Sequence, residues 1–160
     1  MRNTTLCYIE NDNQYLMLHR VKKKNDLNRG MWIGVGGKFE EGETPEECLL
    51  REVLEETGLS LTDYKLRGIV TFVSDCWENE YMHLYSAYSF TGTLSDSSEG
   101  DLAWVDKIEV EKLPMFLGDK IFLRLIADKS YPYFSLKLCY EGTTLKSASL
   151  NGKTIDITKI

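Results

Sequence analysis

Residues 37–59 read GKFEEGETPEECLLREVLEETGL, and this stretch decides how the chain is expected to fold and act. It places Gly37, then five residues, then Glu43, then seven residues, then the run Arg-Glu-apolar-any-Glu-Glu-any-Gly-apolar from Arg51 to Leu59. Seven fixed identities and two apolar positions coincide at a given start on the order of once in a billion at ordinary residue frequencies. Chance therefore does not explain the spacing.

The segment carries its own signals for a helix. Thr44 and Glu47 have the spacing of a capping box, Pro45 occupies the first helical position, and Gly58 supplies the glycine that ends a helix. The sequence therefore predicts a helix from Pro45 to Thr57.

The predicted helix has two chemically different faces. At 100° per residue, three glutamates, Glu52, Glu55 and Glu56, fall within an arc of roughly 100°. The face between about 60° and 200° from Glu52 is apolar. Its residues are Leu49, Leu50, Val53 and Leu54.

The three glutamates repel one another and cost stability unless a cation joins them. Carboxylate oxygens are ligands that Mg²⁺ prefers. The alternative is an acidic helix face that is simply solvated, which is common. The preceding Gly36-Gly37 favours the metal, because backbone without Cβ atoms can approach a phosphate or offer a carbonyl oxygen to a cation.

The rest of the chain alternates apolar segments with polar turns. Apolar and β-branched runs predict a hairpin near the start, strands after the helix and a hairpin near the end, and apolar residues at helical spacing predict a second helix. The predicted strands are 4–9, 15–20, 31–35, 64–73, 81–90, 102–105, 134–140 and 143–149, the second helix is 118–128, and loops occupy 22–30 and 91–101.

Length and charge narrow the class of protein. A chain of 160 residues that is 42% hydrophobic can build one core, so we expect a single domain over residues 1–160. The formal net charge is −6, and no basic stripe matches a duplex phosphate backbone, so we expect no duplex nucleic acid partner. No apolar run approaches the length of a membrane span, and no signal segment begins the chain, so a membrane partner is not expected.

The cysteines suggest neither a zinc site nor a disulfide framework, because they are scattered without a Cys-x-x-Cys pair. We expect each of them to be a small buried side chain, and we expect a reducing, cytoplasmic location. They are Cys7, Cys48, Cys76 and Cys139.

Over residues 37–59 the chain resembles the Nudix hydrolases. The resemblance implies an α+β fold, an α/β/α sandwich around a central mixed β-sheet. It also implies a divalent metal ion, Mg²⁺ or alternatively Mn²⁺, that neutralises phosphate charge and lowers the pKa of the attacking water. The metal ligands that the resemblance implies are the Gly37 carbonyl, Glu52, Glu55 and Glu56.

The same resemblance gives roles to three more residues. Arg51, paired with Glu43, would orient the carboxylates. Either Glu52 or a carboxylate on a facing loop would accept the proton of the attacking water as general base. Glu99 is the candidate on that loop, and a glutamate that is only solvated is the alternative for Glu99.

Outside this stretch the chain looks like the MutT-type oxidised purine nucleoside triphosphatases. The likeness rests on 30–38 (GMWIGVGGK), Trp104, 115–119 (MFLGD) and the hairpin at 134–149. It implies that Phe116 stacks on the purine and that Asp119 accepts hydrogen bonds from its edge. A charge that stabilises the N-terminus of the second helix is the other role open to Asp119, and the two are compatible.

Two positions depart from that subgroup. Ile33 stands where the subgroup has an asparagine that contacts the base, and Leu27 where it has a phenylalanine in the lid loop. Because Ile33 cannot hydrogen-bond a base edge, a preference for 8-oxoguanine must come from Asp119, backbone groups or pocket shape. Arg20 and Lys38 are the predicted contacts of the triphosphate.

The function predicted from these features is metal-dependent hydrolysis of nucleoside triphosphates to a nucleoside monophosphate and pyrophosphate, which would sanitise oxidised purine nucleotides such as 8-oxo-dGTP. The expected partner is a small nucleotide, and the expected state is a monomer or homodimer. One alternative keeps the chemistry but acts on ADP-ribose or a capped RNA end. Another is a nucleotide sensor without catalysis, although such proteins usually lose the glutamates that this chain retains.

Overall fold

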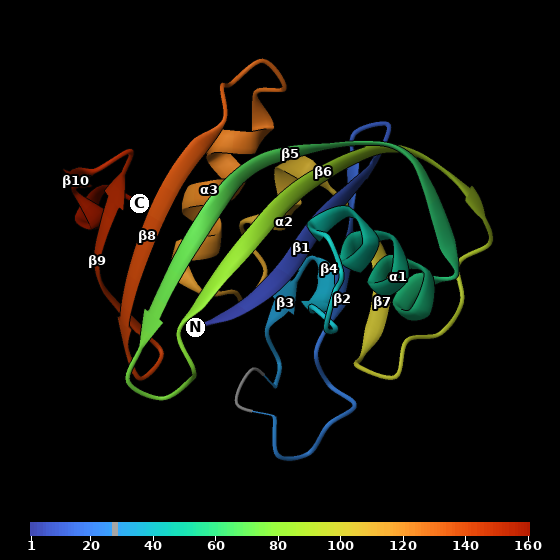
Figure 1. Cartoon of the computed structure of the whole chain (residues 1–160), viewed down its shortest axis with the longest axis horizontal. Coiled ribbons are helices and arrows are strands. Elements are labelled where there is room, and N and C mark those ends of the chain that lie inside the picture. Colours follow the sequence, from blue (N-terminus) through green and yellow to red (C-terminus); the bar gives the residue numbers. More distant parts are fainter. Residues whose placement is uncertain (27–28) are drawn as a thin grey trace.

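A mixed β-sheet forms the centre of the fold in the computed structural model, which describes residues 1–26 and 29–160 (Figure 1). The strand order is β10-β9-β8-β5-β6-β1-β2-β3, with β4 paired to β1 and β7 to β2. The strands are β1 (Arg2–Asn11), β2 (Gln14–His19), β3 (Trp32–Ile33), β4 (Val35–Lys38), β5 (Leu59–Ser74), β6 (Glu80–Gly92), β7 (Asp101–Asp106), β8 (Phe134–Glu141), β9 (Thr144–Leu150) and β10 (Lys153–Ile155).

Both strand directions occur in the sheet. β1 pairs in parallel with β6, and β5 pairs in parallel with β8, whereas β5 and β6 are antiparallel. Figure 1 shows these long strands side by side. The predicted mixed sheet is therefore confirmed.

Helices α1 (Pro45–Thr57) and α3 (Leu117–Ala127) cover opposite faces of the sheet. Successive side chains of β1 point to alternate faces, so each face has apolar side chains on which a helix can pack. Tyr8 packs in one core with Phe122, whereas Ile9 packs in the other with Val53. The predicted α/β/α sandwich is thus confirmed. The chain also has α2 (Lys107–Val110) and a 3₁₀ turn (Ile157–Lys159).

Helix α1 begins and ends where its sequence predicts. The Thr44 hydroxyl accepts a hydrogen bond from the Glu47 N–H at 3.1 Å, and the Glu47 carboxylate accepts one from the Thr44 N–H at 3.1 Å. Gly58 ends the helix in the left-handed region, with φ of 78°. Val53 is fully buried, whereas Leu54, which also falls on the apolar arc, is 51% exposed. Leu54 lies at the far edge of the apolar arc, beyond the reach of the sheet.

The prediction of one strand over 31–35 is wrong in one respect. The segment contains two short strands, β3 and the start of β4, and they pair with different neighbours, β2 and β1. Ile33 pairs with Leu18 of β2, whereas Val35 pairs with Cys7 of β1. The chain crosses from β2 to β1 at Gly34, where a Cβ atom would come within 2.6 Å of the Cys7 carbonyl oxygen. Only glycine allows this close approach.

The last turn of α3 is fixed by a buried arginine. Arg67 on β5 is 1% exposed and donates to the carbonyl oxygens of Ile126 at 3.1 Å and Asp128 at 2.7 Å. These bonds satisfy carbonyls that a helix leaves open at its C-terminus. Arg67 therefore holds α3 against β5 and fixes the helix whose first turn faces the cavity described below.

The other predicted elements are confirmed within a few residues, except that β5 begins five residues before the predicted 64, directly after Gly58. The prediction of four buried cysteines is wrong for Cys76, which is exposed in the turn after β5, and only in part right for Cys139, which is half-buried. Cys7 and Cys48 are buried, and all four are free thiols. In the described part of the chain, no helix combines the length and apolar character that crossing a membrane requires.

Candidate active site

A cavity of about 600 Å³ opens between the start of β1, the turn after β3, α1, the β5–β6 turn and α3. Its lining has a polar end and an apolar end, and the ion pair of Arg2 and Glu80 lies on the apolar side, where Glu80 is the strand neighbour of Phe72. The polar lining includes Arg20, Lys23, Lys38, Glu52, Glu56 and Glu99, and the apolar lining includes Ile33, Phe72, Trp77, Met82, Phe116 and Phe122, with Asp119 among them.

The carboxylate of Glu52 lies directly against the backbone of Gly37. A Cβ atom at Gly37 would come within 2.4 to 2.6 Å of the three carboxyl atoms of Glu52. The Glu52 side chain is only 14% exposed. The absence of a side chain at Gly37 is therefore what lets β4 and α1 bring a carbonyl and a carboxylate together.

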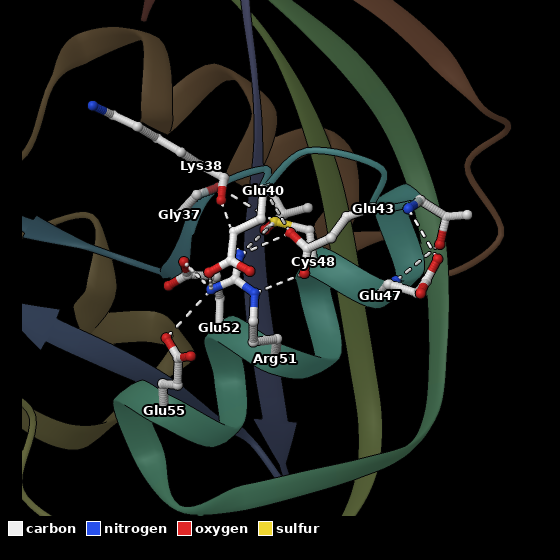
Figure 2. Close-up of polar contacts among 11 residues, drawn as sticks. Gly37, Lys38, Glu40, Glu43, Glu47, Cys48, Arg51, Glu52 and Glu55 are labelled. Atoms are coloured by element: carbon white, nitrogen blue, oxygen red, sulfur yellow. Dashed lines mark hydrogen bonds and ion pairs between the residues drawn. The ribbon is translucent and has the colours of Figure 1, made fainter.

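Arg51 joins the loop before α1 to the carboxylates on α1 (Figure 2). Its guanidinium donates to both Glu43 oxygens at 2.7 and 2.9 Å, to Glu52 Oε1 at 2.8 Å and to Glu55 Oε2 at 3.3 Å. It also donates to the Lys38 carbonyl at 3.0 Å. The bidentate bond fixes the guanidinium plane and with it the direction of the Glu52 carboxylate.

These contacts change how the groups titrate. The hydrogen bonds from Arg51, with one from the Glu40 backbone, lower the pKa of Glu43 to about 2. The same bonds raise the pKa of Arg51. Burial raises the pKa of Glu52, and the charges of Glu55 and Glu56 add to the rise, whereas Arg51 opposes it. Keeping Glu52 ionised in this site therefore costs free energy, and a cation bound nearby would reduce that cost.

Glu56 reaches across the cavity to the loop between β6 and β7. Its carboxylate accepts a hydrogen bond from the Ser97 hydroxyl at 2.5 Å, and the same hydroxyl oxygen accepts from the Glu99 N–H at 3.1 Å. Ser97 is 2% exposed. Ser97 therefore fixes the distance between α1 and the loop that carries Glu99.

Glu99 faces basic side chains from the segment after β2. Lys23 donates to Glu99 Oε1 at 2.8 Å, and Arg20 donates to Glu99 Oε2 at 3.4 Å. Arg20 also donates to Asp26 at 2.6 Å. Arg20, which the sequence predicts as a contact of the triphosphate, and Lys23 are thus gathered at the polar end of the cavity.

The apolar end of the cavity contains a buried carboxyl group. Asp119, in the first turn of α3, is 9% exposed, and burial raises its pKa to about 7. Its charge also contributes to raising the pKa of Tyr140, after the larger effect of burial. A carboxyl group that is costly to ionise and lines an open cavity suits hydrogen bonding to a ligand.

The predicted site residues divide between these two ends. Glu52, Glu56 and Glu99 meet at the polar end, and Glu55 lies beside them through Arg51. Phe116, Asp119 and Ile33 meet at the apolar end. Leu27 lies outside the described residues. Figure 2 shows the Lys38 ammonium extending away from the Arg51 cluster, and Lys38 lines the cavity from this exposed position.

The donor set suits a hard divalent cation, because every candidate ligand is a carboxylate or carbonyl oxygen. As they stand, no three acidic, histidine or cysteine side chains within residues 1–26 and 29–160 gather closely enough to hold one. Arg51 engages Glu55, and Ser97 engages Glu56. Binding a cation therefore requires these carboxylates to exchange partners, while Glu52 and the Gly37 backbone are already adjacent.

The sequence did not point to Trp77, which lines this cavity, or to Ser97, which holds Glu56 and the Glu99 N–H beside it. Ser97 sits in a polar loop, and only its burial distinguishes it from its neighbours. Trp77 stands in the polar turn 75–79 (DCWEN), where a large aromatic side chain is unusual. That contrast was a usable signal for Trp77.

Known proteins resemble this chain in sequence and in structure. The NUDIX domain model matches residues 1–126. An uncharacterized Nudix hydrolase of Bacillus subtilis (strain 168) is 35% identical over 124 residues, 74% of this chain and 75% of that protein. The oxidized purine nucleoside triphosphate hydrolase of Danio rerio is 33% identical over 112 residues, 67% of this chain and 69% of that protein.

Among solved structures, the crystal structure of a mutator MutT protein from Bacillus halodurans has a TM-score of 0.85 and 29% identity. The match covers 96% of this chain and 99% of that one. The structural likeness therefore continues past residue 126, into the C-terminal hairpin.

Proposed function

Because this chain belongs to the NUDIX domain family, we propose that it hydrolyses nucleoside triphosphates to a nucleoside monophosphate and pyrophosphate, with oxidised purine nucleotides such as 8-oxo-dGTP as its preferred substrates. The family assignment itself makes the chain a Nudix hydrolase of small nucleotide compounds. The choice among such compounds is the proposal.

One observation carries the proposal, namely that a single cavity joins the carboxylates of α1 to an aromatic end that contains Asp119. A nucleoside triphosphate has the matching polarity, with anionic phosphates at one end and a flat base at the other. Arg20, Lys23 and Lys38 line the phosphate end and would bind the phosphate oxygens. A volume of about 600 Å³ lies within the range of sites that bind small molecules.

The carboxylates have separate tasks in this proposal. Glu52, Glu55, Glu56 and the Gly37 carbonyl would hold a divalent metal, which when bound neutralises phosphate charge and acidifies the attacking water. Arg51 keeps Glu52 in place through Glu43. Glu52 or Glu99 would take the proton from the water, since both carboxylates line the same cavity.

In this proposal, Asp119 and the aromatic side chains of the cavity recognise the base. Asp119 offers the carboxyl group on the apolar wall, whereas Ile33 contributes shape but no hydrogen bond. A site built to hydrogen-bond a substrate group discriminates far better than an apolar pocket does. Discrimination of an oxidised base therefore depends on Asp119.

Turnover of a nucleotide panel tests this function. With Mg²⁺ present, we expect hydrolysis of 8-oxo-dGTP, measured as pyrophosphate release, to have a higher kcat/KM than hydrolysis of dGTP or of ADP-ribose, and we expect no hydrolysis after chelation with EDTA. Cleavage of ADP-ribose gives AMP and ribose 5-phosphate, so it is measured as AMP release. Mn²⁺ in place of Mg²⁺ should also support release. A higher kcat/KM for ADP-ribose than for every triphosphate would refute the proposed substrate class but not the hydrolase assignment.

Gly37→Ala should damage catalysis more than folding. The new Cβ atom would collide with the Glu52 carboxyl group, which sits at the end of a flexible side chain and can move away. We therefore expect kcat to fall by about tenfold, because a displacement of about 1 Å costs that much or more, with little change in Tm. Pyrophosphate release and thermal unfolding measure the two effects.

Gly36→Ala is the matched comparison. There the Cβ atom would meet the carbonyl oxygen of Thr5 at 1.9 Å, and that oxygen belongs to the paired backbone of β1. A backbone atom cannot move aside cheaply, so Gly36→Ala should lower Tm. If both variants lost the same amount of Tm, the conclusion that Gly37 serves to make room for the Glu52 carboxylate would be wrong.

A further inference from the structure

We propose that Trp77 supplies the aromatic face on which the nucleotide base stacks, and that Phe116 supports Trp77 instead of stacking on the base itself. This inference rests on the proposed function, because it assigns a residue to the base end of the same cavity. It reverses the role that the family resemblance gives to Phe116.

Trp77 stands among the aromatic residues of the apolar end. It lies in the turn between β5 and β6 and lines the cavity together with Phe72 and Phe116. Its ring centroid is 6.1 Å from that of Phe72 and 5.9 Å from that of Phe116. All three rings are therefore within reach of one base, and their orientation decides which of them it stacks on.

The planes of Trp77 and Phe116 are nearly perpendicular, at 87°. A base parallel to one ring is then edge-on to the other, so a single base cannot stack on both. Phe116 is only 8% exposed, and Tyr140 meets it at 82° in a second edge contact. Because only 8% of Phe116 is exposed, it offers a base little accessible surface.

Trp77 is more accessible than Phe116. Its side chain is half-buried, and its contacts with Phe72 and Phe116 are both T-shaped, at 64° and 87°. Phe72, in contrast, already has Tyr140 stacked on one face at 4.9 Å and 21°. Stacking on a base needs a ring that is accessible and has no parallel neighbour, and among these three rings Trp77 meets both conditions.

The turn that carries Trp77 is held in place before any ligand binds. The Ser74 hydroxyl oxygen accepts hydrogen bonds from the N–H groups of Cys76 at 3.0 Å and Trp77 at 3.2 Å. The Ser74 N–H in turn donates to Asn79 Oδ1 at 3.0 Å. A turn already fixed in this way loses little conformational freedom when a base stacks on it, which favours binding.

The test measures binding of nucleoside monophosphates in the absence of metal, so that it does not depend on turnover. The probes are 8-oxo-dGMP and AMP, because every base has a face that can stack. We expect Trp77→Leu to raise Kd by about tenfold, and Trp77→Phe, which keeps an aromatic ring, to raise it less than threefold. Phe116→Leu is the matched control, and its Kd should rise less than that of Trp77→Leu. Calorimetry gives Kd, and thermal unfolding verifies that each variant is folded.

Tryptophan fluorescence gives an independent readout. Trp32 and Trp104 stack on His19 and Phe90, and neither is among the residues that line the cavity. We expect nucleotide to quench the emission of the wild-type protein, and Trp77→Phe to lose most of that quenching. This comparison decides the matter even if Trp77→Leu does not fold.

Two results would overturn the assignment. One is a Kd for Phe116→Leu that rises tenfold while Trp77→Leu binds like the wild type. The other is quenching that is equal in the wild type and Trp77→Phe, or absent with both probes. Failure of the proposed function would give a different result. The wild-type protein would then release no pyrophosphate from 8-oxo-dGTP, although nucleotide still quenched the fluorescence of Trp77.

Discussion

Replacing Glu52 with glutamine is expected to lower kcat for nucleoside triphosphate hydrolysis by about a thousandfold, since removal of a general base alone costs a factor of roughly 100 to 10,000. Glu52 has the carboxylate that lies against Gly37 and receives the Arg51 hydrogen bond. Glutamine keeps the size of the side chain but removes the charge. Steady-state pyrophosphate release gives kcat, and calorimetry with the nucleoside monophosphate gives Kd.

The ratio of the two effects is the informative quantity. Glu52→Gln should change Kd for the monophosphate far less than kcat, because a carboxylate that acts on the reacting atoms stabilises the transition state and not the bound product. The exposed Glu41, in the turn before α1, provides a control of identical chemistry, and Glu41→Gln should retain wild-type kcat. Equal losses in kcat and in affinity for Glu52→Gln would show that Glu52 only helps to bind nucleotide.

Asp119 has the second large effect, on recognition of the base. Asp119→Ala should raise KM for 8-oxo-dGTP by about 10- to 100-fold, which is the usual cost of losing hydrogen bonds to a charged or strongly polar group. Loss of kcat should be smaller, because Asp119 belongs to α3 and not to the carboxylates of α1. Wild-type KM in the variant would remove Asp119 from base recognition and leave it as a group that stabilises the start of α3.

Asp119 should also make stability depend on pH. In the unfolded chain an aspartate has a pKa near 3.9, whereas burial raises the pKa of Asp119 to about 7 in the folded protein. Between these values the folded state binds the additional proton, so the free energy of unfolding falls as pH rises, by about 1.4 kcal/mol per pH unit and about 4 kcal/mol in total. The stabilising contribution is complete below pH 4 and is lost once pH exceeds 7.

Asp119→Asn isolates this contribution. Other groups titrate in both proteins, so the difference between them reports Asp119 alone. Urea unfolding at pH 5, 6, 7 and 8 should show the variant gaining stability relative to the wild type as pH rises. If the stability difference stays the same at all four pH values, the Asp119 carboxyl group does not retain its proton in the folded protein.

The features that could be predicted from the sequence are those determined by residues close together in the chain. The bounds of α1 are set by Thr44, Pro45, Glu47 and Gly58, all within the helix or at its ends. Its inward face follows from periodicity, although the extent of that face depends on how far the sheet reaches, which is why Leu54 is exposed. Local signals thus locate the helix and its carboxylates but not the edge of its contact with the sheet.

The features that could not be predicted from the sequence depend on contacts between segments far apart in the chain. The crossing at Gly34 is imposed by the Cys7 carbonyl of β1. The bond from Ser97 to Glu56 joins residues 41 positions apart. The orientation of Trp77 relative to Phe116 depends on how the β5–β6 turn meets the start of α3. In each case the residue is visible in the sequence, but its partner is not.

The two ends of the cavity come from separate parts of the chain, and this has an evolutionary consequence. The carboxylates belong to α1, the loop before it and the β6–β7 loop, whereas the base end includes the β5–β6 turn and the start of α3. Substitutions at distant sites usually have independent effects. Drift at Trp77, Phe116 or Asp119 can therefore redirect the enzyme to a new nucleotide while its hydrolytic chemistry is inherited unchanged, so a lineage can change its substrate without passing through an inactive ancestor.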